Sequence, residues 1–365
     1  MVSFTPTEEQ QQLIDTIRRY STNDVQPIAH EADEHGSIPE RVLQMGWEIG
    51  LIPSSIPEEM GGFGELSAIT GVLAAEELAF GDLSVAMAVM NPALFAYPVT
   101  LFGTAEQREN WLPPFLEEKP FAATAALLEP GVFFDAHDLK TTATVSGDKV
   151  KLNGVKAYVP LAQDAQIMLV YAKDSETGTV DGYLVQRGTP GVEIAEQEKL
   201  MGLRALPTYR LKLSDAEVDL PCRLGGAVGS DFQAILNRSR IALSALSVGV
   251  ARAAFEYARD YAKQRVAFGS PIAQKQAIAF MLAEMAIEVD SARLLTWEAA
   301  WKLDQGEDAT KEAYLAKTYA DKAVMQVTDS AVQVLGGYGF IREYPAERWL
   351  RNARGFSTFE GLAIV

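Results

Sequence analysis

The spacing of apolar residues changes twice along this chain, and this change limits the possible folds more than any other feature. Up to about residue 118 the spacing is helical, as in Leu13, Ile14 and Ile17. The middle is rich in Thr and Val and holds strand-like runs at residues 167–172, 183–186 and 209–213. After Gly229 the helical period returns, as in Ile278, Met281, Leu282, Met285 and Val289. This order of blocks predicts an α+β protein with an antiparallel β region between two helical ones.

Short polar motifs predict where several of these elements begin and turn. Thr7 and Thr104 are each followed three residues later by Gln, which is the pattern of a capping box at a helix start. Ser146-Gly147-Asp148 and Asn153-Gly154 interrupt the strand-like region and predict hairpin turns. The many small residues in positions 242–254 suit close packing in a helical bundle.

One uncharged stretch, residues 83–103, is long enough to span a bilayer. Asn91-Pro92 and Pro98 interrupt it, and because Pro breaks helices we expect a buried helix that leads into a turn, with no membrane contact. The first residues lack a basic region followed by an apolar run, which is the pattern of a secretory signal. We therefore expect a cytoplasmic protein.

The net charge and the small numbers of Cys and His argue against a nucleic-acid-binding or membrane-binding protein and against a metal site. The chain has 32 Lys and Arg against 49 Asp and Glu, a formal net charge of −17, which opposes binding of nucleic acid or an anionic membrane. A local Arg cluster can still bind a small anion. Cys222 is the only cysteine, which excludes an intrachain disulfide and a multi-cysteine metal site. His30, His35 and His137 lie in charged segments, so we expect surface residues and predict no metal site.

Several longer motifs follow one another in a specific order. They are IPEEMGGFG at residues 56–64, FGTAEQR at 102–108, RVAFGSPI at 265–272, AVQVLGGYG at 331–339 and Glu360-Gly361. With these motifs distributed over nearly the whole length, the chain resembles the acyl-CoA dehydrogenase family. The last hundred residues look most similar to the medium-chain members.

The resemblance implies an architecture and an activity. The architecture is an N-terminal α-helical domain (residues 1–118), a middle antiparallel β domain (119–226) and a C-terminal four-helix bundle (227–365). The activity is that of an oxidoreductase that removes two hydrogens from the α and β carbons of an acyl-CoA thioester, with hydride transfer to N5 of FAD and electrons passed to an electron-transfer flavoprotein. Since two subunits hold each FAD in this family, a homo-oligomer is implied, either a dimer or a dimer of dimers.

The resemblance also assigns site residues. Glu360 stands at the position of the base that takes the α proton, and it is the only base candidate, because Ser239 stands where other branches carry theirs. The substrate-binding positions are Phe134, Arg240, Phe359 and Gly361. The flavin-facing positions are Leu127, Leu128, Tyr158 and Pro160, and those around the adenosine-diphosphate half of a neighbouring subunit's FAD are Arg265, Phe268, Gln276, Gln333, Gly336 and Gly337.

The flavin-facing motifs depart from the family pattern. Leu128 and Phe134 stand where the family has Thr and Ser, and Pro160 stands where it has a Thr near flavin N5, so side-chain donors are missing. Three hypotheses remain: an FAD-dependent acyl-CoA dehydrogenase, a non-flavin or half-site subunit of a heteromeric acyl-CoA dehydrogenase, and a non-redox acyl-CoA-binding or scaffold protein. Losing two or three hydrogen bonds of about 0.5–1.5 kcal/mol each weakens flavin binding without abolishing it. Retention of Glu360 favours the first hypothesis.

Overall fold

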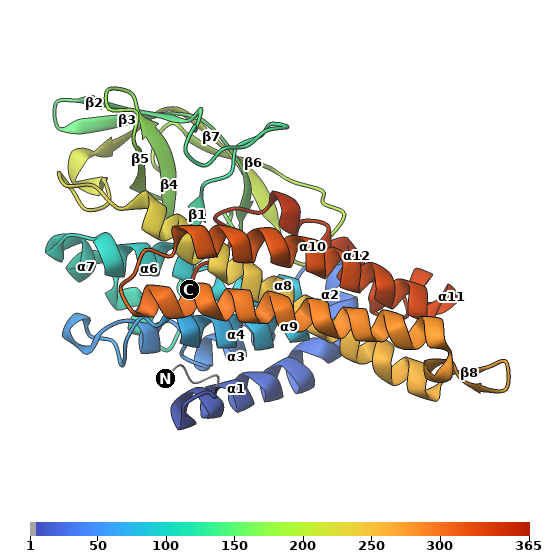
Figure 1. Ribbon diagram of the computed structural model, residues 1–365. Coiled ribbons are helices and arrows are strands. Elements are labelled where there is room, and N and C mark those ends of the chain that lie inside the picture. The colour runs from blue at the N-terminus through green and yellow to red at the C-terminus, as the bar shows by residue number, and fades with distance from the viewer. Residues whose placement is uncertain (1–4) are drawn as a thin grey trace.

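Seven α-helices form the N-terminal part of the computed structural model, which describes residues 5–365 (Figure 1). They are α1 (Glu8–Tyr20), α2 (Ala29–His35), α3 (Glu40–Glu48), α4 (Ala68–Gly81), α5 (Leu83–Met90), α6 (Ala93–Phe102) and α7 (Ala105–Trp111). The side chains of Thr7 and Thr104 accept the N–H groups of Gln10 and Gln107 at 3.2 and 3.1 Å, and both Gln side chains bond back to the Thr N–H. Both predicted capping boxes are therefore confirmed.

The uncharged stretch forms α5 and α6, which are separated at Asn91-Pro92 as predicted. Pro98, however, lies inside α6, so the prediction that it interrupts the helix is wrong. Packing outweighs the local cost of Pro because the residues on every side of α6 around Pro98 are buried.

By length and composition, α8 (Phe232–Gln264) and the bent pair α5–α6 are candidate membrane spans within the described residues. In α8, 78% of the apolar window is buried inside the protein, and every residue of α5 is buried. Packing in the protein core therefore accounts for the apolar character of these helices.

The middle region folds into one seven-stranded sheet. Its strands are β1 (Ala123–Ala126), β2 (Thr142–Ser146), β3 (Lys149–Pro160), β4 (Ile167–Asp174), β5 (Val180–Gln186), β6 (Val192–Gln197) and β7 (Thr208–Asp219). The order is β1-β4-β2-β3-β7-β6, and β5 pairs with β4. The predicted β domain is confirmed, with one difference in pairing: β4 runs parallel to β1 and β2, whereas the other pairs are antiparallel.

The two predicted hairpin turns have different outcomes. Ser146-Gly147-Asp148 turns the chain from β2 into β3, with Gly147 at φ 66°. Asn153-Gly154 lies within β3 instead, so that prediction is wrong. The side chain of Asn153 exchanges hydrogen bonds of 3.1 and 2.8 Å with Asp215 of β7, next to a register shift in this pair. These cross-strand bonds hold the strand extended where a turn was expected.

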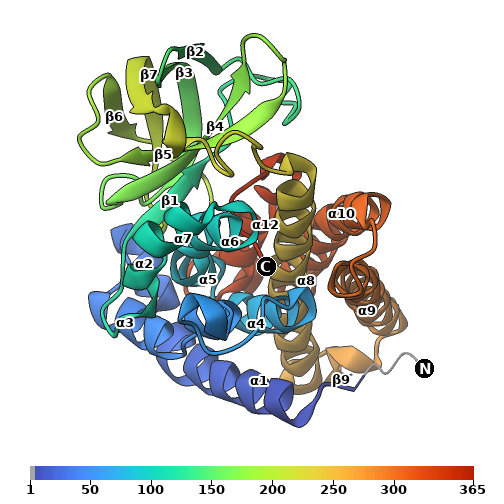
Figure 2. The ribbon, with the colours of Figure 1, turned by 90° about the vertical axis from the view of Figure 1, so that its left-hand side faces the viewer.

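The C-terminal region is helical and carries one small hairpin. The elements are α8, the hairpin β8 (Val266–Ala267) and β9 (Ser270–Pro271), α9 (Gln276–Asp304), α10 (Thr310–Leu335), α11 (Gly337–Phe340) and α12 (Ala346–Ala353). Three helices of the predicted bundle are long, and α12, which packs against α10 and α8, has only eight residues. Figures 1 and 2 show the sheet on one side of the combined helical body.

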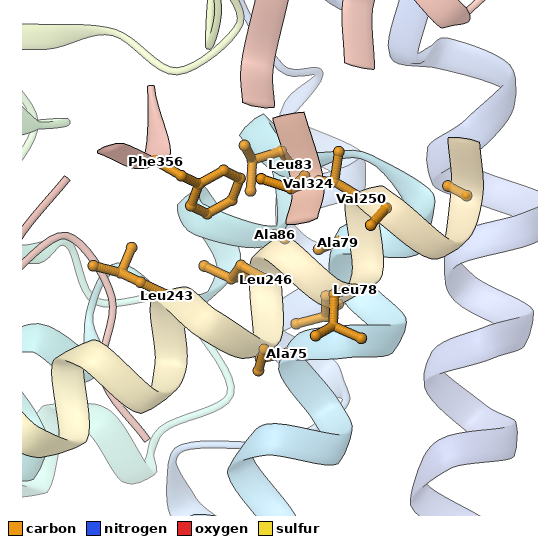
Figure 3. Packing of buried hydrophobic residues seen from close by; sticks show 14 of the residues in the cluster. Ala75, Leu78, Ala79, Leu83, Ala86, Leu243, Leu246, Val250, Val324 and Phe356 are labelled. Carbon is orange, nitrogen blue, oxygen red and sulfur yellow. The ribbon is translucent and has the colours of Figure 1, made fainter. Parts of the chain in front are cut away.

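The two helical regions share one hydrophobic core. Figure 3 shows residues of α4, α8 and α10 packed together with Phe356; those labelled include Ala75, Leu78, Ala79, Leu243, Leu246, Val250 and Val324. Small residues let α4 and α8 approach closely, since a Cβ on Gly249 would lie 2.3 Å from the carbonyl oxygen of Glu76. Phe356 belongs to this core and lies four residues before Glu360, so its packing holds the segment that carries Glu360 against the core.

A charged network crosses the same helices. Arg252 of α8 donates to Glu76 and Glu77 of α4 at 2.8 Å, Arg18 of α1 donates to Glu77 at 2.7 Å, and Arg293 of α9 donates to Glu76 at 2.9 Å. Burial acts to raise the pKa of Glu77, but the hydrogen bonds from Arg252 and Arg18 keep that pKa below its ordinary value. The pairing of Glu77 therefore stabilises the fold above the ordinary pKa of its carboxyl, and this contribution is lost as the pH falls through its lowered native pKa.

We expect Glu77→Gln to lower the free energy of unfolding by about 2 kcal/mol at neutral pH, because the largely buried Arg252 then keeps only Glu76 as a close charged partner and Arg18 loses its own. The deficit should shrink as the pH falls from the ordinary pKa of a Glu carboxyl to the lowered pKa of native Glu77, where the wild-type carboxyl is itself being protonated. Urea unfolding at neutral pH and at about pH 3, below the ordinary pKa of a Glu carboxyl, measures both effects. Glu9→Gln, at an exposed position of α1, is the control. Equal midpoints for the two variants would show that the network does not stabilise the fold.

Candidate active site

Glu360 and Arg240, the predicted base and a predicted substrate residue, form an ion pair. Arg240 lies on α8, and Glu360 follows a 3₁₀ turn at Phe356–Thr358. Nε of Arg240 is 3.1 and 3.3 Å from the two carboxylate oxygens, and its guanidinium lies 5.7 Å from the ring centre of Tyr314 on α10. The Glu360 side chain is 20% exposed, so a ligand can reach a carboxylate whose orientation is fixed.

Aromatic packing and one lysine hold the segment before Glu360. A Cβ on Gly355 would lie 2.1 Å from the ring of Phe359, which packs directly over it, and the rings of Phe356 and Phe359 are 5.6 Å apart. Nζ of Lys317 donates to the carbonyl oxygen of Phe356 at 2.7 Å. Phe359, a predicted substrate residue, is thus buried beneath the base.

Sequence reasoning missed Lys317 and its partner Asp321, one turn further along α10. Nζ of Lys317 donates to Oδ2 of Asp321 at 2.6 Å, and Oδ1 of Asp321 is buried without a partner among the described residues. Burial raises the pKa of Asp321 to about 6 against the effect of Lys317, and the charge of Glu360 adds to the rise. A Lys and an Asp four residues apart are common on exposed helix faces, so their spacing alone gave no signal.

Gly361 has two constraints that place it beside the base. Its N–H donates to Oγ of Ser239 at 3.0 Å, and it adopts φ 68°, which favours glycine. A Cβ there would lie 2.6 Å from Cδ2 of Leu127, so glycine lets this backbone approach the end of β1. In the part of the chain that the structure describes, the N–H of Glu360 itself has no hydrogen-bond partner.

Leu128 and Tyr158, which are both predicted to face the flavin, lie on neighbouring segments of the chain. The carbonyl oxygen of Leu128 accepts the N–H of Ala157 at 2.9 Å. Tyr158 lies at a bulge of β3 with φ 54°, and its N–H donates to Glu198 at 2.7 Å. These main-chain groups are therefore already paired within the protein.

Pro160 and Phe134 complete the flavin-facing group. Pro160 is buried and pairs with Thr208 of β7, whose hydroxyl is buried without a partner among the described residues. Cross-strand partners share one face of a sheet, so this hydroxyl is an available hydrogen-bonding group beside Pro160. Phe134 is half-buried and packs against two core clusters, whereas the adjacent Phe133 is 98% exposed.

A buried ion pair holds these strands in place. Nζ of Lys156 on β3 donates to Glu129 at 2.8 Å and to the carbonyl oxygen of Leu127 at 3.1 Å. Glu129 also accepts the N–H groups of Lys140 and Thr141. Burial acts to raise the pKa of Glu129, but Lys156 and these donors hold it below its ordinary value.

The second predicted group lies elsewhere, around the hairpin β8–β9 at the far end of the helical body from the sheet (Figure 1). Its members are all exposed; they are Arg265, Phe268, Gln276, Gln333, Gly336 and Gly337. The guanidinium of Arg265 lies 5.5 Å from the ring centre of Tyr338 on α11, and Phe268 is 95% exposed. The structure thus gathers this group at one end and does not bring it to Glu360 within one chain.

Comparison with known proteins decides the family. Three family models match in order: the acyl-CoA dehydrogenase N-terminal domain at residues 7–119, the middle domain at 124–216 and the C-terminal domain at 230–363. The chain belongs to the acyl-CoA dehydrogenase family. It is accordingly an oxidoreductase that acts on the CH–CH bond of acyl-CoA thioesters.

Relatives and solved structures match over nearly the whole chain. The short-chain specific acyl-CoA dehydrogenase of Bos taurus, a mitochondrial protein, is 36% identical over 98% of this chain and 88% of its own length. The butyryl-CoA dehydrogenase of Megasphaera elsdenii is 32% identical, with a TM-score of 0.89 over 98% of this chain and 96% of its own. PigA, solved as an FAD complex, is 25% identical, with a TM-score of 0.90 over 98% and 95%.

Two separate groups of residues fit FAD, the cofactor of this family. At the hairpin end, a Cβ on Gly336 or Gly337 would meet open space, and the exposed guanidinium of Arg265, which lies against Tyr338, has no carboxylate partner among the described residues and suits a phosphate. At the sheet end, the buried hydroxyl of Thr208, which has no partner in the described part of the chain, is a side-chain donor beside Pro160. Among the described residues, no group of three or more His, Cys, Asp or Glu could hold a metal ion.

Proposed function

We propose that this protein is an FAD-dependent acyl-CoA dehydrogenase of short acyl-CoA thioesters, with Glu360 as the base that takes the α proton. The observation that carries the proposal is the geometry of Glu360: a fixed, partly exposed carboxylate next to a backbone N–H that has no partner among residues 5–365. The named activity of the bovine and Megasphaera relatives supports the class of substrate.

The two groups at Glu360 suit the two needs of the reaction. The α proton of a thioester is only weakly acidic, so its removal needs a positioned carboxylate and a donor to the carbonyl oxygen, on which negative charge develops. Glu360 accepts the proton from the α carbon, and its own N–H donates to that oxygen. The β hydrogen leaves with its electron pair as the α–β double bond forms, and FAD, when bound, supplies the acceptor for this hydride.

We also propose that two copies of the chain build each active site. The hairpin group and the sheet group lie at separate places on one chain, so a single FAD can contact both only across a subunit interface. Along α9, the exposed apolar residues recur every seven positions on one helix face; they are Phe280, Ile287, Leu294 and Trp301. Such a stripe, exposed in the part of the chain that the structure describes, supports association into a dimer or a dimer of dimers.

The proposals for the electron acceptor and the cellular location do not rest on contacts in the structure. We propose an electron-transfer flavoprotein as the acceptor, on the family resemblance. The cytoplasmic location stays a prediction, and the bovine relative is named a mitochondrial protein.

The proposal is tested by the visible spectrum of the protein purified from a riboflavin-sufficient host. We expect about one FAD per chain, bleached anaerobically by butyryl-CoA. The missing side-chain donors at Leu128 and Pro160 favour one competing function, a half-site subunit that completes a partner's FAD site. A colourless protein that also fails to take up added FAD would support that function and overturn ours.

A further inference from the structure

The chain runs inward after Glu360. The inner segment, residues 361–365, is buried throughout, and each residue from Leu362 to Val365 is 4% exposed or less. Both ribbon views place Val365, the last residue of the sequence, within the helical body, where it lies near α4, α6 and α8 (Figures 1 and 2). The residues directly following the base therefore fill the protein interior beside it.

Specific contacts hold the inner segment at both ends. At its start, Gly361 is fixed by Ser239 and Leu127, as described above. At its end, Nη1 of Arg238 on α8 donates to the carbonyl oxygen of Val365 at 2.8 Å, and burial lowers the pKa of Arg238. Val365 also packs so closely on α4 that a Cβ on Gly71 would lie 2.6 Å from the Cβ of Val365.

Little space remains around the inner segment. One cavity, of about 10 Å³, is lined by Ser239, Gly361 and Ile364, and another, of about 30 Å³, is lined by Tyr97, Ile364 and Val365. Cavities of this size hold about one or two water molecules. The surrounding side chains of α6, α8 and β1 are mainly apolar, so the space would suit a hydrocarbon chain if Ile364 did not occupy it.

The inference that follows rests on the proposed function. If Glu360 takes the α proton, the thioester lies at its exposed side, and carbons beyond the β position need apolar space inside the protein. We propose that the inner segment sets the acyl chain length of this enzyme, with the side chain of Ile364 closing the space that a longer acyl group needs. The substrates are accordingly short acyl thioesters of the size of butyryl-CoA.

The experiment measures kcat/KM for butyryl-, hexanoyl- and octanoyl-CoA in the FAD-loaded wild type and in Ile364→Ala. Each methylene newly accommodated by the variant should raise relative kcat/KM about fourfold. We therefore expect the hexanoyl-to-butyryl ratio to rise about tenfold or more. The control is Ile17→Ala, because Ile17 is equally buried but lies on α1, at the outer edge of the helical body in Figure 2. A general loss of packing lowers both rates and leaves the ratio unchanged.

Two further measurements separate the outcomes. If Ile364→Ala does not fold, Ile364→Val removes a single methyl-sized group and should move the ratio in the same direction by about fourfold. An unchanged ratio in a folded Ile364 variant that still oxidises butyryl-CoA overturns the inference and leaves the proposed function standing. A wild type that holds FAD but is not bleached by any of the three thioesters refutes both.

Discussion

Glu360→Gln should lower the rate of flavin reduction by butyryl-CoA by about three to four orders of magnitude, the upper range for loss of a general base. Gln has nearly the shape of Glu and can still accept the hydrogen bond from Nε of Arg240, so the segment should keep its position. It cannot take the α proton at neutral pH. The expected result is a yellow protein with normal FAD content that is reduced very slowly in anaerobic stopped-flow measurements.

The control for this variant is Glu343→Gln, at an exposed position before α12, which should reduce at the wild-type rate. If Glu360→Gln keeps more than about a tenth of the rate, another group takes the proton. Asp321 is then the next carboxylate to replace, since its pKa of about 6 and its place near Glu360 suit a base. This outcome would leave the family and the fold unchanged and correct the mechanism.

Much of the fold could be predicted because local patterns and burial agree. The capping boxes at Thr7 and Thr104 involve residues only three positions apart, and the structure confirms both. The errors occur where tertiary contacts override local preference. Pro98 remains in a helix because α6 is buried, and Asn153-Gly154 remains in a strand because of its bonds to Asp215.

The candidate site was predictable only through the order of the motifs. No spacing rule links Arg240 to Glu360, which are 120 residues apart, and the structure shows their ion pair. Lys317 and the inner segment were missed for a different reason. In the sequence, Lys317 resembles an ordinary surface lysine, and the inner segment resembles an ordinary apolar part of the core. Lys317 matters because it donates to Phe356, and the inner segment matters because it directly follows Glu360.

The largest effect expected from the assembly is recovery of activity by mixing two inactive variants. Arg265→Glu reverses the charge that should face the FAD phosphates, so this homo-oligomer should lose FAD, and the Glu360→Gln homo-oligomer should bind FAD but react slowly. In a mixed dimer, the Glu360 of the first variant and the Arg265 of the second meet in one intact site. Subunits carrying different affinity tags, co-expressed and purified on both tags, should show about a quarter to a half of wild-type activity.

A second mixture should stay inactive, and this result would show that association with a partner subunit does not by itself restore activity. When wild type is paired with the double variant Arg265→Glu/Glu360→Gln, each site of the mixed dimer receives one altered half, so these dimers should be nearly inactive. If each chain held FAD with its own two groups, the wild-type subunit would remain active in this mixture, and the first mixture would recover nothing. The two mixtures therefore distinguish sharing between subunits from binding within one chain, because the hairpin group and Glu360 lie at separate places on the same chain.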